Sequence, residues 1–349
     1  MEDEVEDDNQ VKKTYVSDDD LYRRSTQYRL WSFLADDLRE KQVKANEYGQ
    51  TYATTKFNQA YQSIKQENPE VFEQYSQELQ PSNLLNLITV DEEIKFIQYY
   101  SNMIIKLSSI FQMPTQVKAT AISLFKKFYL HNSVMEYHPK NILYTCLFLA
   151  AKSENFFISI ESFIKPLKKT IASDILDLEF IVLQSLKFTL MVHHPFRPLY
   201  GFFLDFQAVL LFPSLLYDVN IDTIGQLYDK AKTWLNDYAL LSNVSFLFTP
   251  PQIALAALYD CDKRITDKYL KAKFIQDKDN RDNYELLVKT IRKCVTIAKE
   301  SHLSTKDEST EIDRKCYFCL HPKKLIEKKV NKLKGLQNND SNVNNANNV

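Results

Sequence analysis

The sequence predicts an all-α protein, and three of its features support that fold class. Glycine occurs only four times among 349 residues, whereas β-sheet proteins use glycine in hairpin turns and bulges. Apolar residues make up 44% of the chain and recur at helical spacing through its central part. Proline stands where helices are expected to begin, since Pro114, Pro139 and Pro250 each precede an apolar periodic run.

The charge of the chain is unevenly distributed, although its net charge is only −1. Residues 1–20 contain nine acidic residues and two lysines, a net charge of −7. Residues 313–336 contain eight basic and two acidic residues, a net charge of +6. The body between these segments is nearly neutral, so it attracts phosphate backbones only weakly. We therefore expect no direct binding of nucleic acid.

Cysteine content and hydropathy favour a reduced, soluble, intracellular protein. No secretory signal pattern and no run of 18 apolar residues occurs, so no membrane segment is expected. The number of cysteines is odd and most lie in apolar stretches, which argues against a disulfide framework. They are Cys146, Cys261, Cys294, Cys316 and Cys319.

The two ends of the chain differ in composition from its centre. Residues 1–16 are acidic and residues 338–349 contain seven asparagines, so both are predicted to be disordered. An amphipathic helix that docks on the body is expected within 17–47, and a Gln-, Asn- and Tyr-rich excursion with some helix within 48–85. We group residues 17–87 as an N-terminal helix followed by this variable excursion.

The centre of the chain is predicted to contain two helical domains. Two segments, 141–152 and 174–188, are apolar almost all round, which is typical of helices surrounded by other helices. Two prolines interrupt the helical pattern in VHHPFRPLYG, and His193 and His194 are expected to line this junction. The expected ranges are 88–191 for the first domain, 192–300 for the second and 301–337 for a C-terminal helix region.

An internal repeat supports the division into two domains. At an offset of 111 residues, Pro139, Ile142, Leu147 and Lys152 recur as Pro250, Ile253, Leu258 and Lys263. The same offset, without a gap, relates Ile175, Leu176, Phe180, Leu183 and Leu186 to Leu286, Leu287, Ile291, Cys294 and Ile297. This pattern predicts a tandem duplication of one helical domain.

Four segments resemble the cyclin H family, and the resemblance extends from about residue 17 to 300. They are YRRSTQYRLWSF (22–33), FKKFYLHNSVMEYHPKNILYTCLFLAAKSEN (125–155), HHPFRPLYGFFLDF (193–206) and LFTPPQIALAAL (247–258). The resemblance implies tandem cyclin-box repeats of five helices each, with additional N- and C-terminal helices. It also implies a nuclear regulatory subunit without catalytic residues or cofactors.

The resemblance further implies a set of partners. The expected partner is the cyclin-dependent kinase of transcription factor TFIIH, which phosphorylates the C-terminal domain of RNA polymerase II to support transcription initiation. A RING-finger assembly factor would complete the kinase module, and the module would connect to the TFIIH core. The alternative is a DNA-binding factor of the TFIIB kind, which uses the same helical repeat but carries a zinc ribbon and basic faces.

Lys152 and Glu179 match the two kinase-contacting residues of cyclins. Glu179 lies in an almost continuous apolar run, where an unpaired carboxylate would be costly, and Lys152 is a suitable partner. The alternative for Lys152 is a structural role at a helix C-terminus. In the second repeat, Lys263 occupies the equivalent position with Thr290 opposite, and Ser153 stands where some cyclins have an aromatic residue.

Two further groups of residues are expected at interfaces. Leu149, Glu154 and Leu183 are predicted to complete the kinase-binding surface around Lys152 and Glu179. Tyr22, Tyr28 and Trp31 are predicted to dock the N-terminal helix on the first repeat.

The C-terminal region offers two motifs, and both are interpreted structurally. Cys316 and Cys319 with His321 resemble half of a zinc site, but a second ligand pair is missing, so no metal is expected. The basic segment 323–334 has apolar residues at helical spacing and is interpreted as an amphipathic docking helix rather than a nuclear import signal. The sequence contains no glycine-rich phosphate loop, so an enzyme is not expected.

Overall fold

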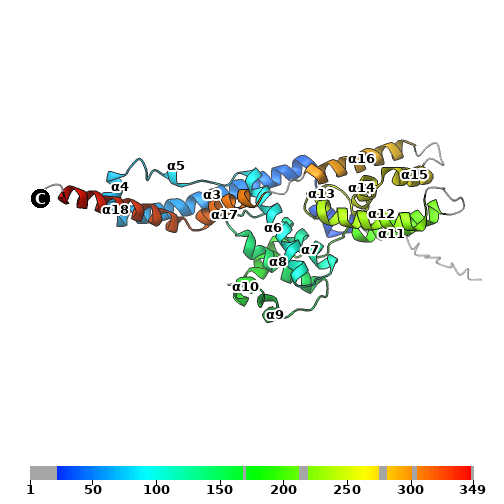
Figure 1. Ribbon diagram of the computed structural model, residues 1–349, viewed down its shortest axis with the longest axis horizontal. Coiled ribbons are helices and arrows are strands. Elements are labelled where there is room, and N and C mark those ends of the chain that lie inside the picture. The colour runs from blue at the N-terminus through cyan, green and yellow to red at the C-terminus, as the bar shows by residue number, and fades with distance from the viewer. Residues whose placement is uncertain (1–21, 168–169, 212–218, 275–280, 301–304, 347–349) are drawn as a thin grey trace, which may run out of the picture.

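The computed structural model describes residues 22–167, 170–211, 219–274, 281–300 and 305–346. Every regular element within these ranges is helical, which confirms the predicted all-α class. The molecule is elongated, with two helical domains and an arm of long helices that extends from them (Figure 1). None of the helices in the described ranges is both long and apolar enough to span a bilayer.

The first domain consists of five helices around one core. They are α6 (Val90–Ile110), α7 (Thr115–Phe128), α8 (Pro139–Ser153), α9 (Ile160–Ile164) and α10 (Ala172–Ser185). Local sequence signals explain where they begin. Thr89 and Glu92 form a capping box at α6, Pro114 caps α7, and Pro139 opens α8 behind the His138 cap.

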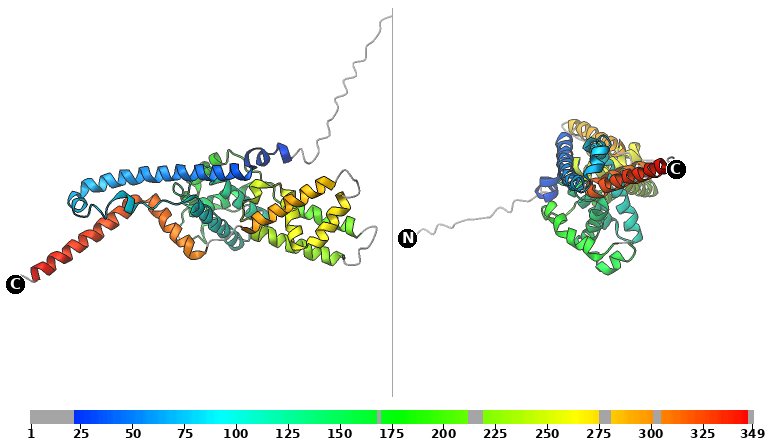
Figure 2. Two further views of the ribbon diagram at one scale, coloured as in Figure 1. Left: turned by 90° about the horizontal axis from the view of Figure 1, so that it is seen from above. Right: turned by 90° about the vertical axis from the view of Figure 1, so that its left-hand side faces the viewer.

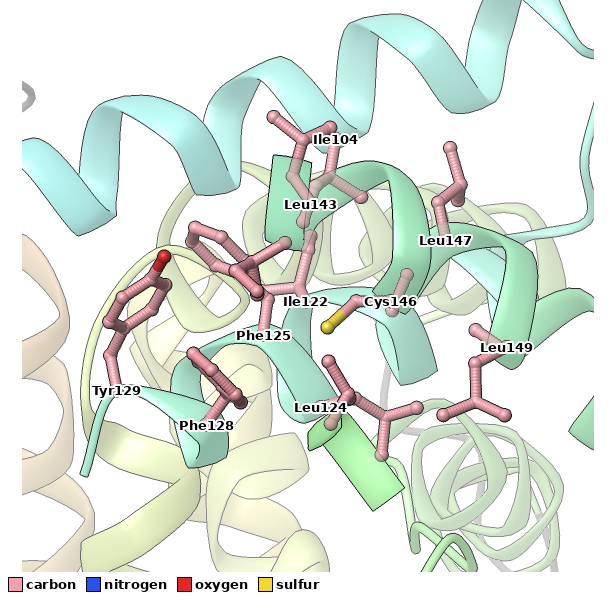
Figure 3. Packing of buried hydrophobic residues seen from close by; sticks show 14 of the residues in the cluster. Ile104, Ile122, Leu124, Phe125, Phe128, Tyr129, Leu143, Cys146, Leu147 and Leu149 are labelled. Atoms are coloured by element: carbon pink, nitrogen blue, oxygen red, sulfur yellow. The ribbon is translucent and has the colours of Figure 1, made fainter. Parts of the chain in front are cut away.

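Helix α8 is at the centre of the first domain. Figure 3 shows side chains of α7 and α8 meeting, with Ile104 of α6 beside them. Cys146 and Leu147 of α8 and Phe125 of α7 have no exposed surface. The prediction that segment 141–152 is surrounded by other helices is therefore confirmed.

The second domain repeats the five-helix arrangement. Its main helices are α11 (Phe196–Leu210), α12 (Ile221–Trp234), α14 (Pro250–Cys261), α15 (Lys263–Phe274) and α16 (Arg281–Glu300). A π-helical segment, Leu235–Ala239, and the short α13 (Val244–Leu247) link α12 to α14. The helix α14 begins at Pro250 with a capping box of Thr249 and Gln252, as the proline pattern predicts.

The arm joins both ends of the chain. The chain begins with the short α2 (Thr26–Trp31), which precedes the arm. The N-terminal helices of the arm are α3 (Ala35–Glu67), α4 (Pro69–Gln74) and α5 (Pro81–Leu84). Its C-terminal helices are α17 (Lys306–Leu320) and α18 (Pro322–Ala346). In Figure 1 and in the left view of Figure 2, the C-terminal helices extend away from the domains toward the same end of the molecule as α3. Ile326, Val330 and Leu333 of α18 pack on Phe57 and Ile64 of α3, so the basic C-terminal segment forms an amphipathic docking helix.

Helix α3 corrects the expected boundaries near the N-terminus. A single helix within 17–47 and a weakly helical segment 48–85 were expected, but the chain breaks between α2 and α3 and then continues as one helix to Glu67. Its 33 residues span roughly 50 Å at about 1.5 Å per residue. Contacts with α18 stabilise this Gln- and Asn-rich helix, which has weak amphipathicity of its own. The acidic segment 1–16 lies outside the described residues.

The C-terminal end also differs from the expectation of a disordered tail from residue 338. Helix α18 continues through this asparagine-rich segment to Ala346. Extending an existing helix requires only one additional residue to be ordered per hydrogen bond, which explains why unfavourable residues can follow a stable helix.

A buried polar network fastens α3 to the first domain. Glu93 of α6 accepts hydrogen bonds from Asn46 Nδ2 at 2.6 Å, Ser133 Oγ at 2.7 Å and Val134 N at 2.7 Å. Gly49 lies directly against Ser133, and a Cβ atom at this position would overlap the Ser133 side chain. A side chain at position 49 would therefore push α3 away from this network.

Candidate functional site: a polar pair on the first repeat

The last turn of α8 and the middle of α10 bring Lys152 and Glu179 together. Lys152 Nζ donates a hydrogen bond to Glu179 Oε1 at 2.6 Å and lies 4.5 Å from the centre of the Phe148 ring. Lys152 is in the last turn of α8, where a cation is favoured by the helix dipole. The side chains are 48% and 20% exposed, so the pair lies at the rim of the core. The two side chains therefore lie on the same side of the fold.

The arrangement leaves hydrogen-bonding capacity toward the outside. An ammonium group has three donors and a carboxylate has two acceptor oxygens, and the pair uses one of each for itself. Because the pair is half-exposed, its contribution to folding stability is expected to be below about 1 kcal/mol. Two charged groups held rigidly in this way can bind backbone groups of another protein at little additional entropy cost.

Helix α10 carries exposed apolar side chains on either side of Glu179 in the sequence. Leu176 and Phe180 flank Glu179 on α10 and are 42% and 64% exposed. The rings of Phe180 and Phe188 lie 6.2 Å apart. The exposed apolar residues along α10 and directly at its two ends are Ile171, Leu176, Phe180 and Phe188, and we call them the α10 apolar patch. Exposed apolar residues grouped beside rigid polar groups are typical of protein interfaces.

This patch corrects the expectation that segment 174–188 is surrounded by other helices. Within α10, only Ile175 and Val182 are buried. A helix that is apolar all round can be central to a core or can serve an interface, and periodicity alone does not distinguish the two. The patch residue Phe180 was not predicted as a site residue, although its position next to a lone acidic side chain was a usable signal.

The other predicted kinase-binding residues occupy different positions. Leu149 is only 4% exposed and packs inside the core shown in Figure 3, so it supports α8 and cannot be reached by a partner. Glu154 accepts a hydrogen bond from Thr120 Oγ1 at 2.6 Å. Leu183 is partly buried against the same core. The expected surface location of Leu149 is therefore wrong, because α8 is enclosed on that side.

Trp31 anchors the N-terminal helix at the junction of the two repeats. Its side chain is 1% exposed, and its Nε1 donates to Thr189 Oγ1 at 2.9 Å. Gln27 Nε2 donates to the His193 carbonyl at 3.2 Å, and His193 N donates to Gln27 Oε1 at 2.6 Å. Phe33 N donates to the Phe246 carbonyl of the second repeat at 2.8 Å. The helix was expected on the first repeat and instead contacts both repeats.

The two predicted tyrosines have different environments. Tyr22 makes edge contacts with Tyr28 and with His193, each with ring centres 5.6 Å apart. Burial raises the pKa of the Tyr22 hydroxyl. Tyr28 is 40% exposed, so it remains accessible while Tyr22 seals the junction.

The cysteines near the C-terminus are core residues. Cys316 and Cys319 of α17 are 0% and 1% exposed, and Cys316 Sγ donates to the Val134 carbonyl at 3.1 Å. Burial raises the pKa of the Cys319 thiol to about 11, which disfavours the thiolate that a metal would require. His321 is exposed beside Tyr317. Across the part of the chain that the structure describes, no three His, Cys, Asp or Glu side chains gather as a metal site.

Two family models match the two helical domains. The model described as the N-terminal domain of cyclins matches residues 70–191, which include the Lys152–Glu179 pair. The model described as the cyclin C-terminal domain matches residues 194–299.

Curated cyclins are similar to this chain over most of its length. Cyclin CCL1 of Saccharomyces cerevisiae is 36% identical over 366 residues, which cover 94% of this chain and 89% of the relative. Cyclin mcs2 of Schizosaccharomyces pombe is 38% identical, covering 87% of this chain and 86% of the relative. Cyclin-H of Xenopus laevis is 30% identical, covering 86% and 87%.

Solved structures show the same similarity. A chain in the yeast TFIIK complex of Kin28, Ccl1 and Tfb3 is 36% identical with a TM-score of 0.61, covering 79% of this chain and all of that chain. A chain in the CAK complex of Chaetomium thermophilum bound to ATP-γ-S is 27% identical with a TM-score of 0.67, covering 93% and 95%. Together with the two cyclin domain matches, these relatives show that the chain belongs to the cyclin family and is a cyclin of the H type.

Proposed function

We propose that the chain binds and activates a cyclin-dependent kinase through Lys152, Glu179 and the α10 apolar patch. The observation that carries this proposal is the 2.6 Å ion pair, held at the rim of the first repeat beside exposed aromatic side chains. As an H-type cyclin, the chain is a regulatory subunit, and the chemistry belongs to the kinase. The relative of known structure in the TFIIK complex is assembled with Kin28, which supports a kinase partner of TFIIH.

The proposed mechanism is selection of the active kinase conformation. A protein kinase transfers phosphate only when the glutamate of its C-helix reaches the lysine of strand β3. A cyclin that binds only the inward position of this helix shifts the population toward it by its differential affinity. The rigid polar pair would bind backbone groups beside the C-helix, while Phe180 and its neighbours would cover apolar surface of the kinase.

The wider assembly is also part of the proposal. The yeast complex contains a third component, Tfb3, which supports a third subunit for this chain, and the RING-finger assembly factor implied by the sequence resemblance is the candidate. Association with the TFIIH core, support of RNA polymerase II phosphorylation and nuclear localisation follow from the same assignment. The TFIIB-like alternative predicts a specific gel shift with duplex DNA, whereas a cyclin predicts none.

Alanine variants of the pair test the kinase-binding site. Lys152→Ala and Glu179→Ala should each weaken kinase association by about 2 kcal/mol, roughly 30-fold in Kd, because central polar contacts dominate interfaces. The measurement is titration of purified kinase with each variant, followed by kinase activity at saturating cyclin.

The matched control is Lys263→Ala in the second repeat, which should leave association unchanged. Thermal unfolding should show all three variants folded, since the pair is half-exposed. Full binding and activation by both Lys152→Ala and Glu179→Ala would refute the site.

A further inference from the structure

A small cavity lies where the N-terminal helix meets both repeats. Its volume is about 30 Å³, enough for one or two water-sized species. Trp31 of α2, Lys127 of α7, His193 and His194 of the junction, and Leu240 of the second repeat all line it. The cavity is therefore shared by three parts of the molecule: α2, the first repeat with its junction, and the second repeat.

Lys127 brings an unsatisfied cation to this cavity. Its side chain is 2% exposed, and its buried Nζ makes no hydrogen bond with any of the described residues. The nearest recorded interaction is with the Trp31 ring, whose centre lies 5.4 Å from Nζ. An ammonium group left in this way is costly, because its three donors have lost water without replacement. Burial lowers the pKa of Lys127 to about 7.

Two neighbouring basic side chains, Lys126 and His194, already have hydrogen-bond partners. Lys126 Nζ donates to the carbonyl oxygens of Leu240 and Ser242 in the second repeat. His194 Nε2 lies 2.7 Å from Thr120 Oγ1, and Thr120 in turn donates to Glu154. Lys127 differs from Lys126 and His194 because its Nζ makes no hydrogen bond with any of the described residues.

The cavity also lacks negative charge. No aspartate or glutamate is among the described residues that line it, whereas two lysines and two histidines are. Burial and neighbouring positive charge, including that of Lys127, lower the pKa of both His193 and His194. A buried ammonium group without a counter-ion in a low-dielectric cavity favours an anion over a cation or a neutral apolar ligand.

We propose that this cavity binds a small monovalent inorganic anion of the chloride class, held by the Lys127 ammonium group. The volume excludes larger anions such as nucleotides. The bound anion would supply the missing partner of Lys127 and favour its protonated form. Because the cavity is lined by α2 and both repeats, the anion would also tighten the docking of the N-terminal helix.

The test is an anion exchange at constant ionic strength on the full-length protein. Replacing gluconate, which is too large for the cavity, with chloride or bromide should raise the melting temperature in a saturable manner by roughly 2–4 °C. The variant Lys127→Met keeps the side-chain length without the charge and should lose this dependence. The control Lys118→Met, which changes a half-buried lysine of α7 bound to Asn236, should retain it.

Two further measurements make the result decisive. A bromide derivative should give an anomalous peak beside Lys127 Nζ, and the chloride effect should be larger below pH 7 than above it, since binding favours the ammonium form. The Lys127→Met variant keeps the other titratable groups near the cavity, which are His131, His193, His194 and Lys126. Any pH dependence of the chloride effect that persists in this variant would therefore come from those groups. A melting temperature that does not respond to chloride, or an equal response in Lys127→Met, would overturn the proposal.

Discussion

The two repeats share their third helix but differ in their fifth. Helices α8 and α14 both begin with proline and are buried on nearly all sides, as Ile142 and Ile253 illustrate with 0% and 2% exposure. Among the fifth helices, α10 of the first repeat buries only Ile175 and Val182 and leaves Phe180 64% exposed, whereas α16 of the second repeat buries Val288, Ile291, Cys294 and Ala298. The same scaffold therefore supports an interface in one repeat and a closed core in the other.

The burial pattern also corrects the ungapped alignment of the repeats. At an offset of 111 residues, the buried Ile175 corresponds to Leu286, which is 65% exposed. At an offset of 112, Val182 and Leu186 correspond to Cys294 and Ala298, and all four are 0% exposed, as the full set of these residues shows. One residue rotates a side chain by about 100° around a helix, so burial distinguishes offsets that hydrophobicity alone does not.

This shift changes the counterpart of Glu179. The ungapped alignment placed Thr290 opposite, but the burial pattern places the fully buried Ile291 there. Thr290 instead donates its hydroxyl to the Leu286 carbonyl at 2.9 Å. The comparison teaches that the second repeat cannot form the ion pair, because an apolar core residue replaces its carboxylate.

The largest expected effect on stability comes from placing a glutamate in the second repeat at the position equivalent to Glu179. Ile291→Glu should cost more than about 4 kcal/mol of unfolding free energy, because it buries a carboxylate without a partner. Urea denaturation measures the cost, and the exposed Lys289→Glu on the same helix should stay within about 0.5 kcal/mol. An Ile291→Glu protein as stable as the parent would contradict the burial of Ile291 in the core of the second repeat.

Truncation to alanine should separate the two roles of the fifth helix. Ile291→Ala should lower the unfolding free energy by about 2–5 kcal/mol, as for a large core side chain. Phe180→Ala should change it by less than about 0.5 kcal/mol and weaken kinase association by roughly 1–2 kcal/mol. Denaturation and kinase titration on the same two proteins check both values. Equal loss of stability in the two variants would contradict the interface role of Phe180.

The smallest effects are expected in the response of each repeat to acid. Burial raises the pKa of Glu93 in the first repeat above 4.5, despite the hydrogen bonds that its carboxylate accepts. The contribution of Glu93 to the free energy of unfolding is therefore largest when the side chain is protonated, and it is lost as the pH rises. Although burial opposes it, hydrogen bonds from Tyr269 and Lys273 lower the pKa of Asp205 in the second repeat below 3.8. The contribution of Asp205 to the free energy of unfolding is present above that pH and is lost as the pH falls.

The variants Glu93→Gln and Asp205→Asn should reveal these opposite slopes in denaturation curves measured across the acid range. Relative to the parent, Glu93→Gln should gain stability as the pH rises past 4.5. Asp205→Asn should be less stable than the parent above pH 3.8, and this difference in unfolding free energy should disappear as the pH falls below 3.8. Slopes of the same sign in both variants would contradict this difference between the repeats.

The sequence by itself determined the helical class, the two repeats and the need of Glu179 for a polar partner. These follow from local physics: glycine is scarce, proline and capping residues mark helix starts, and a lone acid in an apolar helix requires a partner. The match of four segments to the cyclin H family added the expected kinase, and the comparisons with known cyclins confirm the family.

Only the tertiary structure decided which apolar helix is enclosed and which is open. Segments 141–152 and 174–188 look alike in sequence, but neighbours cover α8 on all sides and leave Phe180 of α10 uncovered. The same holds for the length of α3, which depends on α18 packing along it. Burial depends on partners distant in the chain, and helical periodicity carries no information about whether those partners are present.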